Sequence, residues 1–513
     1  MGFLKEKKRI QLTAAVIAIL FIAAGCSAFG PARPSGTAQP SATPEASAPA
    51  GSEKSSVLNY VYTTKRSFAV VFSGMSDKNT MEAILSQLDK YNMKALFFLP
   101  GIRVAEEPDI AKEILERGHS IGNDGLEGTD LTKLGYGEIC NRLQKTSQVI
   151  KDETGTTPNF LWNLGGKYND DVLAAAKASG LQFVTYNINL QKWEEKTSAD
   201  VQNYLENKIT RGGIIALPTN DLNTALNTLD LIAKVGDEMG YSVQPLEYLI
   251  ANAYERKPLK EIPGWDAAKL NPNYQNTEYD IVYNGLRDRK VVSISFDDWG
   301  CDLAVTRLLD VLDKYNVKAT FFLRGNGPEM NPNLAKAIAE GGHDVANHTY
   351  THPVLTTQTP EQVQEQIVKC HQVLTEAIQK EPKLLFRPPT GEINEVTARA
   401  IAATGYKDIS LYDVSPLDWS KISEDKIVDY IKKNVTNGSV IVMHLMIELD
   451  TYKALPKVIE FLQQQGYTIM PLSELVSSGN AEILHQLPEW EKAQPSATVN
   501  PNATPTPSFS IEE

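Results

Sequence analysis

Short apolar runs alternate with amphipathic helical patterns along most of the chain. The C-terminal half shows this as two strand-like runs, each followed by helical spacing, at residues 291–296, 301–315, 319–323 and 333–340. Strands that alternate with helices in this way favour an α/β fold with a parallel sheet and crossover helices. An α/β barrel and a doubly wound sheet both satisfy the pattern, and both place chemistry at the C-terminal ends of the strands.

The same pattern occurs twice. Residues 88–101 read LDKYNMKALFFLPG and residues 312–325 read LDKYNVKATFFLRG, with eleven of the fourteen positions identical at a separation of 224 residues. Two long copies do not make a solenoid, which needs at least three short repeats. We therefore predict a duplicated domain and call the two copies the first and second repeat.

The chain begins with a pattern typical of export. Lys5, Lys7, Lys8 and Arg9 precede an apolar run at residues 12–24 that is too short to span a bilayer. The small residues before Cys26 resemble a bacterial lipobox, which implies cleavage before Cys26, acylation of its thiol and a lipid anchor in the cell membrane. A plain secretory signal with an unrelated cysteine remains the alternative.

Composition divides the rest of the chain. The expected segments are a signal peptide at 1–25, a Pro/Ser/Ala-rich linker with the lipidated cysteine at 26–56, the first repeat at 57–250, an inter-domain linker at 251–288, the second repeat at 289–476 and a largely disordered tail at 477–513. The formal net charge of −13 argues against nucleic acid as a partner. Four cysteines in 513 residues exclude a disulfide-dense scaffold.

Polar residues follow the predicted strands of the second repeat. Asp297 and Asp298 end the run at 291–296, Arg387 follows a second apolar run, and His444 follows a third. One such residue would be explained as a helix cap or a turn. Several in one domain indicate a site at the strand ends. Two adjacent acids point to opposite sides of an extended chain, so Asp297 and Asp298 need not do the same work.

A pair of histidines adds a candidate metal site. His348 and His352 are four residues apart and would lie on one face if the segment is helical. Imidazole together with carboxylate is a ligand set that suits Zn²⁺. Surface or capping histidines remain the alternative. His343 has a counterpart, His119, in the first repeat, which favours a structural role for both.

Five motifs in order resemble the NodB-type polysaccharide deacetylases, carbohydrate esterase family 4. They are Ser295-Phe296-Asp297-Asp298, His348-Thr349-Tyr350-Thr351-His352, Arg387-Pro388-Pro389-Thr390-Gly391, Leu417-Asp418-Trp419 and Val442-Met443-His444. The resemblance implies an α/β fold of two tandem distorted (β/α) barrels. It also implies a divalent metal, usually Zn²⁺, and hydrolysis of N-acetyl groups on amino-sugar polymers.

The resemblance also implies a role for each site residue. Asp298, His348 and His352 would ligate the metal, Asp297 would be the general base, and Arg387 would orient Asp297. On the substrate side, the backbone N–H of Thr390 would help to stabilise the oxyanion, Trp419 would form a wall of the sugar site, and His444 would be the general acid.

Two departures from the family pattern concern the catalytic histidine. Ser415 stands where the family often has an acid that supports it, and Leu445 follows His444 where aspartate is common. Asp413 lies two residues before Ser415, on the same face of an extended strand, and could take over the supporting role.

The first repeat has lost the polar site residues. Ser73, Gly74, Asp124, Gly128, Asn163 and Pro218 stand where the second repeat has Asp297, Asp298, His348, His352, Arg387 and His444. A copy without these groups cannot run the same mechanism. It binds glycan, with Trp162, Tyr186 and Trp193 as a sugar platform, or packs against the second repeat, or only supports the fold.

These observations predict a lipid-anchored, metal-dependent N-deacetylase that faces the cell envelope. Its partners would be the membrane, through the anchor, and a polysaccharide, with peptidoglycan favoured because of that location. An O-deacetylase of another acetylated polymer and a non-catalytic glycan-binding lipoprotein are the alternatives. The sequence does not determine the oligomeric state.

Overall fold

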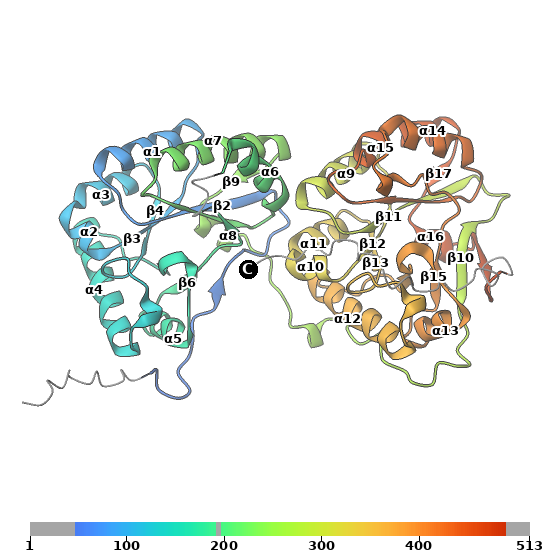
Figure 1. Ribbon diagram of the computed structural model, residues 1–513, viewed down its shortest axis with the longest axis horizontal. Coiled ribbons are helices and arrows are strands. Elements are labelled where there is room, and N and C mark those ends of the chain that lie inside the picture. The colour runs from blue at the N-terminus through green and yellow to red at the C-terminus, as the bar shows by residue number, and fades with distance from the viewer. Residues whose placement is uncertain (1–46, 191–195, 489–513) are drawn as a thin grey trace, which may run out of the picture. The chain divides into compact units, whose positions relative to one another are not determined.

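The computed structural model describes residues 47–190 and 196–488, which belong to one compact unit (Figure 1). The predicted signal peptide, Cys26, most of the linker at 26–56, Trp193 and the tail beyond residue 488 lie outside these ranges. Within them, no helix combines the length and the apolar character needed to cross a membrane.

The first repeat forms one curled sheet with the strand order β1-β6-β5-β4-β3-β2-β8-β7, and β9 pairs with β2. Each pairing between these strands is parallel. The strands are β1 (Val57–Leu58), β2 (Ser67–Ser73), β3 (Leu96–Leu99), β4 (Ser120–Asn123), β5 (Phe160–Leu161), β6 (Gln182–Val184), β7 (Ile188–Asn189), β8 (Ile214–Pro218) and β9 (Ser242–Val243).

Helices connect the strands of the first repeat, as the sequence pattern predicts. They are α1 (Lys78–Lys90), α2 (Gly101–Glu106), α3 (Pro108–Glu116), α4 (Tyr136–Thr154), α5 (Asp170–Ala178), α6 (Ser198–Lys208), α7 (Leu222–Met239) and α8 (Leu246–Ala251), with short 3₁₀ turns η1 (Leu131–Lys133), η2 (Leu164–Gly166) and η3 (Leu259–Glu261).

The second repeat forms the matching sheet, with the order β16-β11-β12-β13-β14-β15-β10-β18 and β17 paired with β11. Its strands are β10 (Asp280–Gly285), β11 (Val291–Asp298), β12 (Thr320–Leu323), β13 (Asp344–Asn347), β14 (Leu385–Phe386), β15 (Asp408–Ser410), β16 (Val440–His444), β17 (Thr468–Ile469) and β18 (Ala481–Leu484). A parallel bridge from Val414, in the segment after β15, to Ile441 of β16 closes the sheet from β16 to β15 on itself, as in a distorted barrel.

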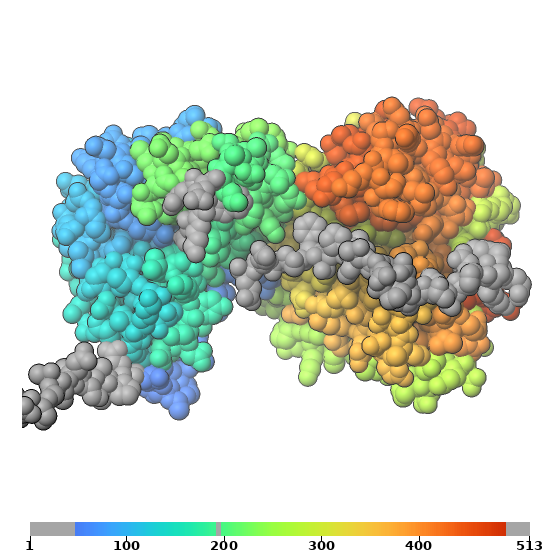
Figure 2. All heavy atoms as spheres, in the orientation of Figure 1, coloured from blue at the N-terminus to red at the C-terminus, as the bar shows by residue number. Residues whose placement is uncertain are grey.

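The helices of the second repeat follow the same order. They are α9 (Asp302–Lys314), α10 (Asn326–Met330), α11 (Pro332–Glu340), α12 (Pro360–Ile378), α13 (Glu395–Ala403), α14 (Glu424–Asn434), α15 (Thr451–Gln464) and α16 (Leu472–Ser477), with 3₁₀ turns η4 (Leu355–Thr357), η5 (Pro389–Gly391) and η6 (Asp418–Ser420). In Figure 2, which has the orientation of Figure 1, the teal atoms of the α4 and α5 region lie at the surface of the first repeat and the orange-red atoms of the α14 and α15 region lie at the surface of the second.

The predicted fold, two tandem (β/α) domains, is confirmed. The second sheet nevertheless extends beyond the range 289–476 expected from the sequence, because β10 lies in the expected linker and β18 in the expected tail. β10 pairs with β15 in parallel and with β18 in antiparallel fashion. Both strands are added at the edge of the sheet and carry none of the five motifs.

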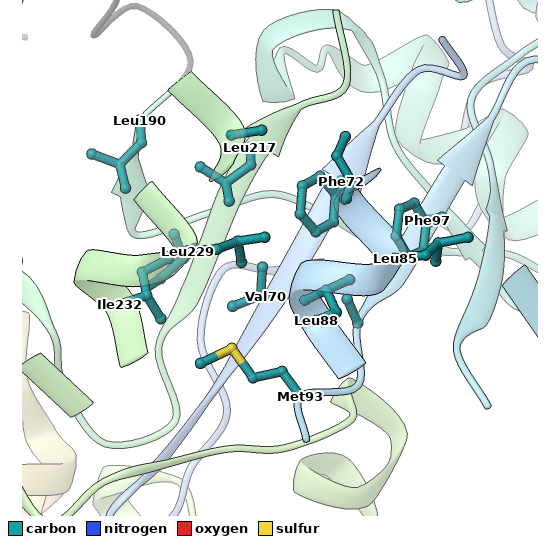
Figure 3. Close-up of a cluster of buried hydrophobic side chains, with 14 of the residues drawn as sticks. Val70, Phe72, Leu85, Leu88, Met93, Phe97, Leu190, Leu217, Leu229 and Ile232 are labelled. Atoms are coloured by element: carbon teal, nitrogen blue, oxygen red, sulfur yellow. The ribbon is translucent and has the colours of Figure 1, made fainter. Parts of the chain in front are cut away.

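Apolar strands hold each repeat together from both faces. Val70 and Phe72 of β2 pack with α1 and α7 in one cluster (Figure 3), while Val71 of the same strand packs in a second cluster on the other face. Phe72 stacks on Phe97 with ring centroids 4.8 Å apart. Strands buried on both faces read as continuous apolar runs, which explains why the sequence marks them so clearly.

The structural role predicted for His119 and His343 is confirmed. Nδ1 of each ring accepts a backbone hydrogen bond, from Ala95 N at 3.1 Å and from Ala319 N at 3.2 Å. Burial lowers the pKa of both histidines to about 4. Each therefore stays neutral at physiological pH and ties the start of one strand to the turn before the next.

Candidate metal and catalytic site

The polar residues of the second repeat gather at the C-terminal edge of its sheet. Asp297 of β11 lies beside His444 of β16 in the parallel register. β13 ends one residue before His348, and β14 ends one residue before Arg387. Parallel strands place their carboxyl ends at one edge, so residues far apart in the sequence meet there.

Asp298, His348 and His352 form a group suited to a metal ion. One ligand atom from each lies within 4.8 Å of the others, and Nε2 of His352 is 3.3 Å from Oδ1 of Asp298. Nδ1 of His348 is 2.8 Å from the carbonyl oxygen of Arg387. Because a carbonyl only accepts, Nδ1 of His348 carries the proton and Nε2 is left as the ligand nitrogen. The three side chains therefore fit a divalent metal.

The two histidines converge through a loop, so the segment is not the helix that their four-residue spacing would also have suited. Thr349 and His352 both have φ of 66°, in the left-handed region that residues other than glycine seldom adopt. The turn is closed by a hydrogen bond from His352 N to Thr349 Oγ1 at 3.0 Å. The rings then lie 5.0 Å apart, which is close enough to share one ion.

Protonation states in this group suit metal binding. Burial on its own would raise the pKa of Asp298, but electrostatic interaction with the nearby rings of His348, His352 and His444 lowers it below its usual range. Burial, reinforced by His348, lowers the pKa of His352 to about 4. A carboxylate and a neutral imidazole are the forms that ligate a divalent cation.

Arg387 is the partner of Asp297. Its Nη1 donates to Oδ1 of Asp297 at 2.7 Å and to Oγ of Ser295 at 2.8 Å, and its guanidinium lies 4.1 Å from the ring centroid of Phe322. Arg387 is fully buried. The other carboxylate oxygen of Asp297 is 4.0 Å from Nε2 of His348. Asp297 is thus held beside the metal group with one oxygen directed toward it.

Asp418 is the partner of His444. Oδ1 of Asp418 lies 2.8 Å from Nδ1 of His444, and Oδ2 accepts from the backbone N–H of His444 at 2.8 Å and from Thr451 Oγ1 at 2.6 Å. Burial opposes the charged imidazolium, but the hydrogen bond and charge of Asp418 raise the pKa of His444 above its usual value. His444 is therefore poised to hold a proton near neutral pH.

The suggestion that Asp413 supports His444 is wrong. Its carboxylate accepts from Val440 N at 2.7 Å and from Arg287 Nη2 at 2.9 Å, so Asp413 is occupied at the start of β16. Asp418 was present in the Leu417-Asp418-Trp419 motif, but sequence reasoning gave it no role of its own. The supporting acid comes from the η6 turn, and only the folded backbone shows how near that turn is to β16.

The residues expected on the substrate side are open to solvent. Trp419 in η6 is 52% exposed and directly follows Asp418. Thr390 in η5 is exposed and has φ of 62°. Arg324, after β12, was not singled out by the sequence, although it also follows a strand end. Its positive charge contributes to lowering the pKa of Asp298 and His352, which places it near the same group.

The first repeat keeps the backbone of the site without its chemistry. Ser73 of β2 lies opposite Pro218 of β8, just as Asp297 lies opposite His444 in the second repeat. Burial raises the pKa of Asp124 well above its usual range, which favours the neutral form of this acid. Asn163, in place of Arg387, accepts from Leu131 N at 2.9 Å as part of a local turn. Among the described residues, the three-residue metal group occurs in the second repeat alone.

The sugar platform suggested for the first repeat is wrong in one member. Trp162 is 1% exposed and belongs to a hydrophobic cluster under the sheet. Tyr186 packs against it with ring centroids 5.9 Å apart, and Trp193 lies outside the described residues. A side chain buried in the core cannot offer its face to a sugar ring, so Trp162 has a structural role.

Known proteins resemble both repeats. A family model described as polysaccharide deacetylase matches residues 61–184 and 284–409. A peptidoglycan-N-acetylglucosamine deacetylase of Bacillus cereus is 31% identical over 210 residues, which cover 40% of this chain and 97% of the relative. A peptidoglycan-N-acetylmuramic acid deacetylase of Bacillus subtilis is 30% identical over 203 residues, covering 39% of this chain and 76% of the relative. A solved family 4 carbohydrate esterase from Streptomyces lividans is 34% identical, covering 35% of this chain and 91% of that chain with a TM-score of 0.33.

Proposed function

The chain belongs to the polysaccharide deacetylase family, and from this premise we propose that its second repeat removes N-acetyl groups from an amino-sugar polymer of the cell envelope, with peptidoglycan as the substrate. The relatives from Bacillus are named as deacetylases of N-acetylglucosamine or N-acetylmuramic acid in peptidoglycan, which supports this substrate class. The observation that carries the proposal is the triplet Asp298, His348 and His352 at the same sheet edge as two further pairs, Asp297 with Arg387 and His444 with Asp418.

The metal we propose is Zn²⁺. A group of two imidazoles and one carboxylate suits Zn²⁺ and leaves a further position open. When bound, the metal supplies a Lewis acid that polarises the acetamido carbonyl and acidifies water. Every remaining task falls to side chains of this chain.

Asp297 is the base in this proposal. Arg387 holds one of its oxygens at 2.7 Å, so the other oxygen is fixed in direction and can accept a proton from the attacking water. The buried guanidinium also serves as the charge partner of this buried carboxylate. Asp297 and Asp298, neighbours in sequence, thereby divide the work between proton transfer and metal binding.

His444 is the acid. Cleavage of the amide C–N bond requires a proton on the departing amine, and the imidazolium of His444 can donate it from Nε2 because Nδ1 is engaged by Asp418. The raised pKa keeps that proton available near neutral pH. The exposed Trp419 beside Asp418 offers an apolar face on which a sugar ring can lie.

We further propose that the protein is exported and anchored by an acylated Cys26. The support is the sequence alone: a basic cluster, a short apolar run and small residues before the cysteine. Labelling with a radioactive or clickable fatty acid, with Cys26→Ser as the matched control, tests it. Loss of label in the variant is expected, and equal labelling of both proteins would contradict the anchor.

The activity is tested by acetate release from the full chain in detergent with Zn²⁺ or Co²⁺. N-acetylglucosamine oligomers, peptidoglycan and acetylated xylan are compared, with Asp298→Ala as the control. Release from the first two substrates that disappears in the variant is expected. Release from xylan alone would identify an O-deacetylase, and absence of both release and bound metal would identify a glycan-binding protein.

A further inference from the structure

A buried ion pair joins the two repeats. Asp302, the first residue of α9 in the second repeat, is fully buried, and its carboxylate accepts from the guanidinium and the backbone N–H of Arg211 in the first repeat. Thr210 Oγ1 donates to it at 2.9 Å, and the hydroxyl of Tyr241 also donates. We call Asp302, Arg211, Thr210 and Tyr241 the Asp302 network.

The network breaks the repeat symmetry. At the repeat offsets, Lys78 stands in the first repeat where the second has Asp302, and Asn437 stands in the second where the first has Arg211. The first-repeat helix α1 is capped in the usual way, because the side chain of Asp77 accepts from the backbone N–H groups of Asn79 and Thr80. Helix α9 has no side-chain cap. The carboxylate of Asp302, in the first turn of α9, binds Arg211 of the first repeat instead.

The network lies at the end of the loop that carries a metal ligand. Asp302 follows Asp298 by four residues. Between them, Gly300 lies so close to the residue after His444 that an added Cβ would stand 2.0 Å from the carbonyl oxygen of Leu445. The loop after β11 and the loop after β16 are therefore packed against each other, and a shift of one displaces the other.

Both loops also pack on the apolar core of the first repeat. Leu303 of α9 is 2% exposed and belongs to the same cluster as Phe72 and Ile232. Cys301 and Ile447, from the two loops, are partly buried against that cluster. The residues that follow the metal ligand Asp298 and the acid His444 thus complete a core that belongs mostly to the degenerate repeat.

A second polar contact fixes the same interface. Asn333 of α11 is buried, and its Nδ2 donates to the carbonyl oxygens of Val61 at 2.8 Å and Arg211 at 2.7 Å, while its Oδ1 accepts from Thr63 N at 3.1 Å. Oδ1 also accepts from the hydroxyl of Tyr254 at 3.1 Å, so backbone groups of the first repeat and one side chain of the segment that follows it satisfy the amide. Such a satisfied buried polar contact permits few alternative arrangements of the surfaces that it joins.

We propose that Arg211 is a positioning residue for the site of the second repeat. Through Asp302 it fixes the loop from Asp298 to Asp302, and with it the carboxylate of the metal group. The degenerate repeat then serves as a buttress for the catalytic loops. The expected effect of Arg211 on catalysis rests on the proposed function. Its expected effect on metal binding rests on the geometry alone.

The test replaces the pair without leaving a lone buried charge. In the full chain, Arg211→Met with Asp302→Asn removes both charges and keeps the approximate shapes. The matched control is Arg66→Gln with Asp310→Asn. This control breaks an exposed ion pair between the repeats, in which Arg66 Nη1 lies 3.1 Å from Asp310 Oδ2. Asp310 lies on the same helix α9 as Asp302, two turns further along. Zn²⁺ affinity of the metal-free proteins is measured by competition with a chromogenic chelator, together with their melting temperatures and with kcat and KM.

The expected result is Zn²⁺ binding weaker by about 10-fold in the Arg211/Asp302 variant, as for other groups that orient metal ligands, with kcat lowered and KM little changed. The control should stay within about twofold of the wild type, because an exposed pair contributes little. Arg211→Lys, which keeps the charge, should recover part of the affinity. A merely structural role would lower the melting temperature of the metal-free protein and leave the Zn²⁺ affinity unchanged.

Unchanged Zn²⁺ affinity in the folded variant overturns the proposal. Loss of polymer binding with unchanged metal affinity also overturns it, since the first repeat would then be a glycan-binding module. If the double variant does not fold, Tyr241→Phe tests the proposal, because it removes one donor to Asp302 and keeps the ring. A smaller loss of Zn²⁺ affinity is expected, and an unchanged affinity would overturn the proposal. If the wild type binds Zn²⁺ but deacetylates no substrate, the proposed function fails while the affinity comparison still stands.

Discussion

The two repeats share a backbone and differ in their chemistry. β2 and β11 occupy the same place in their sheets, yet β2 ends in Ser73 and β11 ends in Asp297 and Asp298. Both strands keep the parallel pairing on each side. The fold is therefore independent of the site residues: apolar strands and a buried structural histidine maintain it, and the strand ends are free to lose their function.

Burial also acts differently on the acids of the two repeats. In the first repeat, burial without a basic partner raises the pKa of Asp124 well above its usual range. In the second, three histidines outweigh burial and lower the pKa of Asp298. Asp298 is accompanied by basic side chains that Asp124 lacks, and loss of the histidines removes two ligands of the metal group even where a carboxylate remains.

The largest expected difference between the repeats concerns the metal. Asp298→Ala should abolish deacetylation and reduce bound metal from one equivalent toward none, because two imidazoles hold a divalent ion poorly without the carboxylate. Asp124→Ala, the matched change in the first repeat, should leave metal content and rate unchanged. Elemental analysis and acetate release measure both, and a loss of bound metal in Asp124→Ala would contradict the comparison.

Next in size is the buried pair of Arg387 and Asp297. Arg387→Met leaves a buried carboxylate alone and should lower the free energy of unfolding by about 3–5 kcal/mol. It should also reduce kcat by on the order of 100-fold through loss of the oriented base. Denaturant unfolding and acetate release give the two values. Adding Asp297→Asn should restore much of the stability and none of the activity; recovery of activity would exclude Asp297 as the base.

A smaller effect is expected on the pH profile. Asp418 raises the pKa of His444, and His444 must be protonated to act as an acid. Asp418→Asn should lower that pKa, so that the alkaline limb of kcat moves to lower pH, and the rate above neutral pH falls by about 10-fold or more. Asp413→Asn, whose carboxylate lies at the start of β16, should leave the limb in place. A shift in Asp413→Asn alone would reverse the assignment of the supporting acid.

The smallest expected effect is on KM, and it distinguishes the roles of two tryptophans, Trp419 and Trp162. Trp419→Ala should raise KM for the polymer by about fivefold, corresponding to roughly 1 kcal/mol of lost contact, with the melting temperature unchanged. Trp162→Ala in the first repeat should instead lower the free energy of unfolding by about 3–5 kcal/mol, as for other large core residues. Thermal unfolding and steady-state kinetics distinguish them, and equal effects on KM would show that Trp162 contacts the polymer.

Much of this arrangement was predictable from local patterns. The apolar run at 291–296 predicted β11, and the spacing at 301–315 predicted α9, because strands buried on both faces and amphipathic helices have distinct periods. The strand-end rule then indicated Asp297, Asp298, Arg387 and His444. Strands β10 and β18 were missed, because they lie in the ranges expected to be a linker and a tail.

The contacts between distant segments were not predictable in this way. A four-residue spacing of His348 and His352 suits a helix as well as a turn, and only the left-handed φ of Thr349 and His352 shows which one occurs. Asp413 and Asp418 are both acids near β15, and only the path of the chain decides which one reaches His444. Side-chain partners depend on where loops run, and loops carry no periodic signal.

The sequence by itself determined the α/β class, the duplication, the loss of site residues in the first repeat and the set of residues at the strand ends. Each of these follows from residue type and period, which are local properties of the chain. Only the tertiary structure decided that Arg387 holds Asp297, that Asp418 holds His444 and that Arg211 reaches Asp302. Each pairing joins residues that are far apart in the sequence. They meet only when the whole sheet and its core are packed.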